Sequence, residues 1–337
     1  MSAENPMMLS CALPPSRDVV RYARHAEMLG YERVWLYDSP ALYGDIWLAL
    51  GRIAEATTTI GLGTGVAVPS LRHPMVTASA IAAVEDLAPG RLVAAFGTGF
   101  TARRAMGKLP MRWADLAEYV VQLRELLAGN TVDVDGAACQ MIHSPGFAPA
   151  RPIDVPLLLA PIGPKGFGVA REIADGVVLA ELPSEPPDER WRFRALLATG
   201  TILEPGDNHT TARVRDALEP YFGTGYHAVW QWSAEAVDDM PGGREWRARI
   251  ENERPESQRH LAVHEGHLVA VTERDRPLVE AAGPGLLQTG WTGDAQSFRD
   301  RLTAARDSGV NEVILTMAGP GVERELELFA EAREVSL

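Results

Sequence analysis

Short apolar segments of strand length alternate with helix-like segments along almost the whole chain, and the pattern recurs eight times. Apolar strands separated by helices pair in parallel, because each helix provides the crossover back to the same edge of the sheet. Eight such units close naturally into a barrel, whereas a doubly wound open sheet more often has about five to seven strands. The sequence therefore predicts an α/β fold, a single (β/α)8 TIM barrel. The expected strands are residues 7–13, 33–38, 59–68, 91–99, 155–163, 175–183, 195–205 and 312–319.

Helix signals fall between these strands. Ser16 is placed to cap a helix that Gly30 ends, and Pro74 opens another helix from its first position. Asp135-Gly136 is typical of the turn in a small hairpin, expected over 131–142. The remaining helices are expected at 45–56, 74–87, 113–127, 164–173, 210–222 and 322–335. We expect one domain over residues 1–337, with an insertion at about 223–266 on the C-terminal face of the barrel.

Charge and composition exclude several classes of partner. The net charge is −13, with no basic stripe, so nucleic acid and anionic membranes are poor partners. Cys11 and Cys139 lie far apart and have no metal-ligand spacing, which fits a reducing compartment. No signal-peptide pattern and no apolar run of about 18 residues is present, so we expect a cytoplasmic protein. The absence of a phosphate-loop motif and of a nucleophile-elbow motif weakens nucleotide-triphosphate and hydrolase interpretations.

Two glycine-bearing strand ends, Gly61 to Gly65 and Gly97 to Gly99, fall about one βα repeat apart. Neighbouring parallel strands end on the same side of a sheet, so both segments could meet one flat ligand there. Glycine permits that close approach because it has no Cβ. The leading hypothesis is a shelf for a planar cofactor. The alternative is that these glycines merely permit tight turns.

Two further strand ends carry candidate binding groups. Asp38 ends a strand and could accept a hydrogen bond from a ring N–H or tune a nearby proton donor, or it could cap the turn at Ser39-Pro40. Gly163, Pro164, Lys165 and Gly166 lead directly into a helix. Helix N-termini present free N–H groups and positive potential, so this turn could bind a phosphate. It could also be an ordinary βα turn with a solvated lysine.

Three more residues could take part in proton transfer or binding. Glu181 follows an apolar strand and could be an acid of raised pKa, a substrate anchor or the partner of an arginine. His264 and His267 stand three residues apart, on one face if the segment is helical. Because no third ligand is near in sequence, no metal site is predicted. Trp230, Trp232, Trp246 and Trp291 could form a lid over a planar substrate or simply pack a core.

Several segments resemble one family. ARHAEMLGYERVWLYD, GTGVAVPSLRHP, LAPGRLVAAFGTG, DVPLLLAPIGPKGFGVAREIADG and GWTGDAQSFRDRLTAARDSGVNEVIL are similar in wording and spacing to the bacterial luciferase-like superfamily of flavin and deazaflavin oxidoreductases. The likeness is greatest to the branch that uses coenzyme F420, including methylenetetrahydromethanopterin reductases. It covers roughly residues 7–180 and 288–330.

That resemblance implies a ring in the mouth of the barrel. It implies a non-proline cis peptide at Gly65-Val66 behind the ring, with Asp38 near the ring edge. It also implies Gly97, Thr98 and Gly99 along the cofactor, and the turn beginning at Gly163 at its phosphate. It further implies a homodimer, with the helices that follow strands two and three at the interface. The implied reaction is hydride transfer between C5 of F420 and a small organic substrate, and Asp38, Glu181 and His264 are the catalytic candidates.

Two departures limit what is carried over. Sugar-phosphate dehydrogenases of this branch have histidine after the strand-two aspartate and glutamate after the second glycine turn, where this chain has Ser39 and Phe100. Their substrate is therefore not transferred, and Glu181, His227, His264 and His267 stay open as replacements for that pair. An FMN-dependent monooxygenase on the same barrel is the alternative function. A cofactor-less accessory barrel is the alternative of another class.

Overall fold

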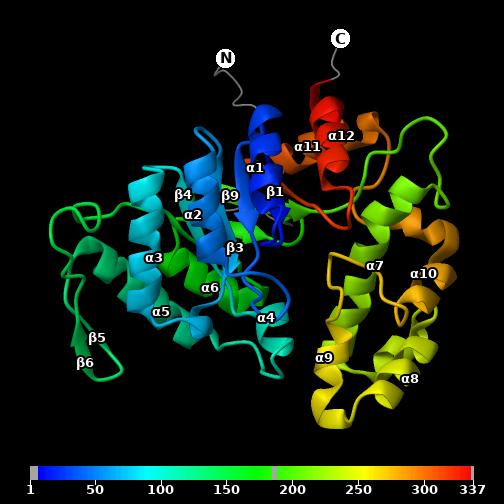
Figure 1. The fold of residues 1–337 in the computed structure, drawn as a ribbon, viewed down its shortest axis with the longest axis horizontal. Coiled ribbons are helices and arrows are strands. Elements are labelled where there is room, and N and C mark those ends of the chain that lie inside the picture. The colour runs from blue at the N-terminus through cyan, green and yellow to red at the C-terminus, as the bar shows by residue number, and fades with distance from the viewer. Residues whose placement is uncertain (1–6, 184–187, 335–337) are drawn as a thin grey trace.

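Eight parallel strands close into a barrel in a computed structural model that describes residues 7–183 and 188–334 (Figure 1). Each strand pairs in parallel with the next around the ring, so the (β/α)8 prediction is confirmed and an open sheet is excluded. The order around the barrel is β1 (Met8–Leu13), β10 (Glu312–Thr316), β9 (Phe193–Ala198), β8 (Gly176–Leu179), β7 (Leu157–Leu159), β4 (Leu92–Phe96), β3 (Gly61–Ala67) and β2 (Arg33–Leu36).

Helices cover the outside of the barrel. Pro74 opens a helix as expected, whereas Ser16 does not cap the first helix, whose N-cap residue is Asp18. The Asp45 carboxylate accepts hydrogen bonds from the N–H groups of Trp47 and Leu48. Gly129 ends α5 in the left-handed conformation. These helices are α1 (Val19–Met28), α2 (Ile46–Ala56), α3 (Pro74–Leu87), α4 (Phe100–Arg104), α5 (Trp113–Ala128), α6 (Gly163–Ile173), α11 (Ala295–Asp307) and α12 (Val322–Glu334).

The expected hairpin forms between β5 (Val132–Val134) and β6 (Ala137–Cys139). Its turn residues Asp135 and Gly136 both have positive φ, 54° and 81°, as a two-residue turn of type I′ requires. The hairpin extends from one end of the molecule, away from the helices that follow β9 (Figure 1).

Most boundaries differ by a few residues from the sequence expectation, and two differ by more. The seventh strand ends at Ala198 rather than continuing to residue 205. The backbone turns away at Gly200, where a Cβ would stand 2.6 Å from the amide nitrogen of Thr292. The following helix, α7 (Ala212–Trp232), continues ten residues beyond the expected end and contains Pro220.

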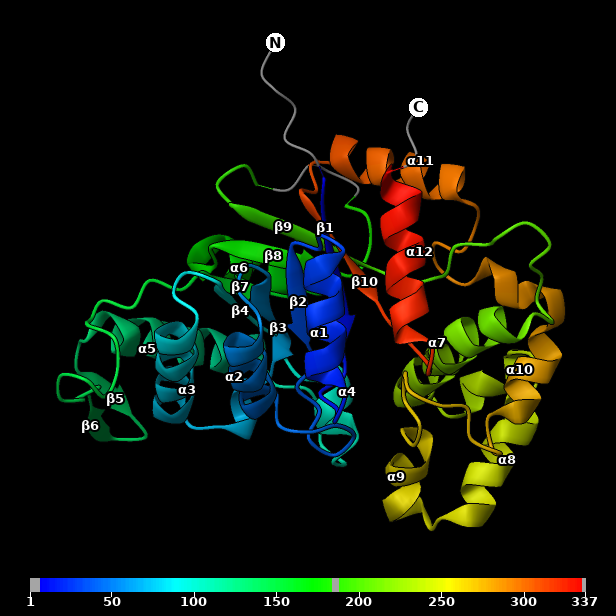
Figure 2. The ribbon, with the colours of Figure 1, turned by 45° about the horizontal axis from the view of Figure 1, so that its top comes forward.

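The segment expected to be an insertion lies within a helical lobe beside the barrel (Figure 2). The lobe has its own core, in which Tyr226, Trp246 and Ile250 are buried together with Val263 and Leu278. No helix in the described parts of the chain has the length and apolar character needed to cross a bilayer. The lobe comprises α7, η2 (Glu235–Asp239), α8 (Gly243–Glu253), η3 (Glu256–Gln258), α9 (Arg259–Val263), α10 (Arg276–Ala282) and η4 (Gly283–Gln288).

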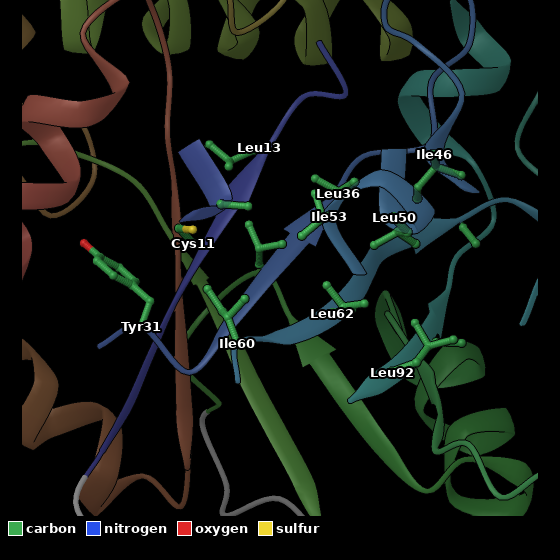
Figure 3. Close-up of a cluster of buried hydrophobic side chains, with 14 of the residues drawn as sticks. Cys11, Leu13, Tyr31, Leu36, Ile46, Leu50, Ile53, Ile60, Leu62 and Leu92 are labelled. Atoms are coloured by element: carbon green, nitrogen blue, oxygen red, sulfur yellow. The ribbon is translucent and has the colours of Figure 1, made fainter. Parts of the chain in front are cut away.

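Alternate residues of each strand face two different cores. Leu36 and Leu62 pack outward against Leu50 and Ile53 of α2, as Figure 3 shows. Trp35, between Val34 and Leu36, instead belongs to the cluster inside the barrel. This is the period of two that strand geometry imposes.

The barrel interior also contains a buried polar cluster at the amino end of the strands. One carboxylate oxygen of Glu312 accepts hydrogen bonds from Ser10 Oγ (2.6 Å) and Trp35 Nε1 (2.8 Å). The guanidinium of Arg33 lies 3.6 Å from the same oxygen. Glu312 is fully buried, and these partners compensate for lost hydration at Oε1, whereas Oε2 is buried without a hydrogen-bond partner among the described residues. Buried polar side chains therefore occupy this end of the barrel interior.

Candidate functional site

A cavity of about 500 Å³ opens at the carboxyl ends of the strands. This is where the active sites of (β/α)8 enzymes lie. Its wall contains residues at the carboxyl ends of β2, β3 and β4 and residues of α7. Its lining residues include Tyr37, Asp38, Ser39, Tyr43, Gly65, Val66, Val68, Gly97, Thr98, Gly99, Phe100, Ala160, Ile162, Leu197, Tyr221, Thr224, Ala228, His267 and Thr316.

The two glycine-bearing strand ends meet on one wall of this cavity. The Gly65–Val66 peptide is cis, as the family resemblance implies. A Cβ on Gly97 would stand 2.6 Å from Cγ2 of Val66, and a Cβ on Gly65 would stand 3.1 Å from Cβ of Trp35. The space that these glycines leave is therefore filled by neighbouring side chains of the protein. Gly65 and Gly97 thus permit close packing within a wall that faces the cavity, and the shelf for a planar cofactor stays a prediction.

At Gly99, both the backbone conformation and the packing favour glycine. Its φ is 79°, in the left-handed region, and a Cβ there would stand 2.6 Å from Cγ1 of Val68. It is the residue immediately before α4, a short helix that was not among the expected elements. Because Phe100 to Ala102 of α4 also line the cavity, this turn continues the wall outward from β4.

Asp38 lies buried beside this wall and uses one oxygen for both of its hydrogen bonds. Its Oδ2 accepts from the backbone N–H of Val68 (3.0 Å) and from Nη1 of Arg72 (2.7 Å). Arg72 also reaches Asp45 at 2.8 Å. Burial raises the pKa of Asp38, and the Arg72 guanidinium opposes that effect in part. In the described chain the second oxygen, Oδ1, accepts no hydrogen bond.

The helical lobe also contributes to the cavity wall. Thr224 and Ala228 of α7 and His267 line it. The Tyr43 hydroxyl, from the barrel side, donates a hydrogen bond of 2.7 Å to the backbone carbonyl of His267. The Phe100 ring packs at a tilt against Trp232 at the end of α7, with ring centroids 5.8 Å apart. Barrel and lobe are thus joined directly over the cavity mouth.

Several residues singled out from the sequence lie outside the cavity wall. Glu181 is exposed, although its neighbour Ala180 is part of the wall. Lys165 is also exposed, on the first turn of α6, while the preceding Ile162 reaches the cavity. A Cβ on Gly166 would stand 2.6 Å from the Trp113 ring, so packing against α5 explains that glycine.

His264 does not line the cavity, but it belongs to a histidine cluster that sequence spacing did not reveal. His227 of α7 lies against both His264 and His267, with ring centroids 5.7 and 5.2 Å away. This third histidine is not near the other two in sequence, but the fold brings His227 next to His264 and His267 in space. Only the packing of α7 against the α9 segment brings His227 within reach, because it lies 37 residues before His264.

Burial keeps these imidazoles neutral. It lowers the pKa of His264 to about 4, with nearby His260 contributing, and that of His267 to about 3, with nearby His264 contributing. The pKa of His227 also lies well below its usual value, because of burial and of the two neighbouring histidines. All three are therefore uncharged near pH 7.

A second cavity, of about 630 Å³, lies in the lobe between α7, α10 and η4. Among the described residues its wall includes no acidic or basic side chain. We therefore place the candidate chemistry in the cavity at the strand ends.

Comparison with known proteins agrees with this fold. Residues 1–312 match the sequence model of the luciferase-like monooxygenase family. A 5,10-methylenetetrahydromethanopterin reductase of Methanolobus tindarius is 34% identical over 49% of this chain and 50% of the relative. An F420-dependent glucose-6-phosphate dehydrogenase of Beutenbergia cavernae is 32% identical over 48% and 52%. The chain thus spans about half the length of these two curated relatives.

Solved structures share the fold over almost the full length. The coenzyme F420 dependent tetrahydromethanopterin reductase of Methanopyrus kandleri has a TM-score of 0.65 at 19% identity, and covers 97% of this chain and 98% of its own. An F420-dependent secondary alcohol dehydrogenase, solved with an F420-acetone adduct, has a TM-score of 0.67 at 18% identity with the same coverage. At such identities the likeness concerns the fold.

Proposed function

The chain belongs to the luciferase-like monooxygenase family, and from that premise we propose that it is an F420-dependent oxidoreductase. The relatives named above for their use of F420 support the cofactor. We further propose that the reaction is hydride transfer between C5 of the deazaflavin and a small organic substrate. The observation that carries the proposal is that Gly65-Val66 and Gly97 to Gly99 line one cavity at the strand ends.

The cavity suits a flat, largely apolar ring. Ala160, Ile162 and Leu197 offer apolar surface next to the wall formed by Val66 and Gly97. Ligand pockets of this type bury most of the ligand against apolar groups and use a few polar groups to fix its orientation. When bound, the deazaflavin supplies the hydride chemistry at its C5 atom. The protein's part is to hold the ring against this wall and exclude water from its face.

Asp38 is our candidate for recognition of the ring edge. Its Oδ2 is already bonded to Val68 and Arg72, which fixes the carboxylate against the end of β3. Its Oδ1 stays available to accept a hydrogen bond from a ring N–H. Because the same carboxylate accepts a hydrogen bond from the Val68 amide, it also positions the end of β3, against which the ring is proposed to lie.

The anionic part of the cofactor is proposed to leave the cavity past Ile162 toward the start of α6. Gly163, Pro164, Lys165 and Gly166 form the first turn of that helix. Its eleven residues supply aligned peptide dipoles, and Lys165 adds an exposed positive charge. These residues would therefore stabilise a phosphate outside the ring cavity.

The substrate side differs from that of the sugar-phosphate dehydrogenases in the family resemblance. In those enzymes a histidine and a glutamate that handle the proton stand at two positions where this cavity wall has Ser39 and Phe100. Phe100 makes this side more apolar, and the nearby polar groups are Tyr43, Thr224 and His267. We propose a small organic substrate with a polar group that these side chains contact.

Cofactor binding tests this proposal. The purified protein is titrated separately with F420 and with FMN, and binding is followed by the fluorescence of each cofactor. We expect F420 to bind and FMN not to bind. Tight FMN binding without F420 binding would instead favour the monooxygenase alternative. Binding of neither would favour a cofactor-less barrel and would contradict the proposal.

A further inference from the structure

We propose that His227, His264 and His267 bind one divalent transition-metal ion next to the ring cavity. One nitrogen from each imidazole lies within 4.8 Å of a nitrogen of the other two. The three come from two parts of the lobe, α7 and the turn after α9 (Figure 1). This inference does not rest on the proposed cofactor, because it concerns side chains of the lobe alone.

Two of the three histidines are buried, the third is half-buried, and neighbouring residues fix their positions. His227 and His264 are each 2% exposed. The His227 ring stacks at 5.9 Å on Trp246, whose indole nitrogen donates a hydrogen bond to Asp275. Tyr43 holds the backbone of His267 through its carbonyl. A site with fixed rings loses little entropy when it binds an ion.

Two ring nitrogens in this cluster are buried without a hydrogen-bond partner, Nε2 of His227 and Nδ1 of His264. Buried polar nitrogens without partners are uncommon, because each loses its hydration without compensation. The amide of Gln231 lies 3.1 Å from Nε2 of His264, and its oxygen is also unsatisfied. Turning that amide by half a rotation lets the oxygen accept from Nε2–H of His264.

That assignment leaves a lone pair on Nδ1 of His264. Histidines that bind metals usually have this arrangement: one ring nitrogen binds the ion and the other donates its N–H to an oxygen. The Nδ1 atoms of His227 and His267 are 2.9 Å apart, so at most one proton lies between them. Ligand nitrogens around a tetrahedral zinc ion are about 3.3 Å apart, from Zn–N bonds of about 2.0–2.1 Å. The Nδ1 atoms of His227 and His267 lie slightly closer together than that, and one nitrogen of His264 lies within 4.8 Å of a nitrogen of each of the other two rings.

The set of ligands selects the class of ion. Three neutral imidazoles suit Zn²⁺, Co²⁺, Ni²⁺ or Cu²⁺, whereas Mg²⁺ and Ca²⁺ require oxygen ligands. The nearby cation Arg274 is balanced by Glu265 at 3.2 Å and Asp275 at 3.4 Å, which limits its repulsion of an ion. Three protein ligands leave one position open. Because His267 also lines the ring cavity, that position suits water or an oxygen atom of a cavity ligand.

Metal titration tests the proposal without the cofactor. Chelator-treated protein is titrated with Co²⁺, read by its visible d–d absorption, and with Zn²⁺ in competition. We expect one ion per chain, and a loss of affinity of at least about 100-fold in His227→Ala and in His264→Ala. His209→Ala, which removes a histidine outside the cluster, should bind as the wild type does. Circular dichroism checks that each variant is folded.

His264→Cys separates ligation from a packing role, and it keeps the proposal testable if the alanine variants fail to fold. A thiolate ligand should retain Co²⁺ and add a sulfur-to-cobalt band in the near ultraviolet. A histidine that only packs would produce no such band. Absence of the d–d absorption in the wild type would overturn the proposal. So would Co²⁺ binding that is unchanged in folded His227→Ala and His264→Ala proteins.

Discussion

The Cγ2 methyl of Val66 lies 2.6 Å from the point where a Cβ on Gly97 would stand. Two strand ends 31 residues apart in sequence therefore pack against each other in the cavity wall. We expect Gly97→Ala to displace Val66, to cost about 1–3 kcal/mol of stability and to weaken F420 binding. The measurements are urea unfolding and cofactor titration.

The matched control is Gly168→Ala, since a Cβ on Gly168 meets no atom within 4 Å and the residue lies in α6. That change should be neutral or slightly stabilising. Val66→Ala combined with Gly97→Ala should recover binding, because it removes the methyl that the introduced alanine side chain would contact. If the double variant binds no better than Gly97→Ala, contact between these two residues is not the cause.

Removing Arg72 should destabilise the protein most at neutral pH. Arg72→Ala leaves the Asp38 carboxylate buried with the Val68 amide as its hydrogen-bond donor, at a cost of about 2–4 kcal/mol at pH 7. Burial already raises the pKa of Asp38, and loss of the guanidinium raises it further. A carboxyl group whose pKa is raised on folding contributes most stability when protonated, and that contribution is lost as pH rises through the folded pKa.

The difference between Arg72→Ala and wild type, measured by denaturant unfolding, should therefore be smaller at pH 4.5 than at pH 7. Arg72→Lys, which retains a positive charge, should show a smaller effect at both values. An equal difference at pH 4.5 and pH 7 would mean that the charge of Asp38 is not what Arg72 compensates.

The ionised Glu27 carboxylate should stabilise the folded protein at neutral pH, and this contribution should be lost in strong acid. Burial alone would raise its pKa, but backbone N–H groups of Thr59, Ile60 and Thr58 donate to Oε1 and lower the pKa to about 2. Because the folded pKa lies below the unfolded one, this stability is present above pH 4.5 and is lost as pH falls toward 2. We expect Glu27→Gln to cost about 1–2 kcal/mol at pH 7, allowing for solvent screening, and less at pH 3. The measurement is thermal unfolding of wild type and Glu27→Gln between pH 3 and pH 7. A stability difference that does not change with pH would contradict this role of the Glu27 charge.

Glu312→Gln should disturb the buried polar cluster at the amino end of the strands. It removes the charge that lies 3.6 Å from the buried Arg33 guanidinium, while an amide oxygen can still accept from Ser10 or Trp35. We expect a loss of about 2–4 kcal/mol in urea unfolding. Glu323→Gln is the control, because its ion pair with Arg21 is exposed and should contribute less than about 1 kcal/mol. Equal effects of the two changes would refute the role given to burial.

Homodimer formation is proposed through α2 and α3, the helices that follow the second and third strands. Leu48 of α2 is 69% exposed and Val76 of α3 is 55% exposed. Exposed apolar side chains on adjacent helices often mark an interface. We expect light scattering to give twice the mass of the chain, and the double change Leu48→Glu with Val76→Glu to give the monomer. Ile142→Glu, at an exposed position beyond the hairpin, should leave the dimer intact. A monomeric wild type would contradict the proposal.

Local sequence patterns were sufficient for the elements of the barrel. Apolar strands between amphipathic helices, Pro74 at a helix start and Asp135-Gly136 in a hairpin turn depend on contacts within a few residues, so the fold class could be predicted. The placement of Gly65 and Gly97 on one wall also followed, because parallel strands must end on the same side. Glu181, in contrast, ends exposed, since a strand-end position does not determine which way a side chain turns.

Contacts between distant segments were decided by the tertiary structure. Nothing in the sequence near His264 indicates His227, and nothing near Asp38 indicates that Arg72 bonds it across 34 residues. Such pairs depend on how the lobe and the loops pack, and that packing results from many weak apolar contacts rather than from a local signal. The sequence by itself thus determined the barrel and the wall, whereas the histidine cluster and the charge pairing of Asp38 required the folded chain.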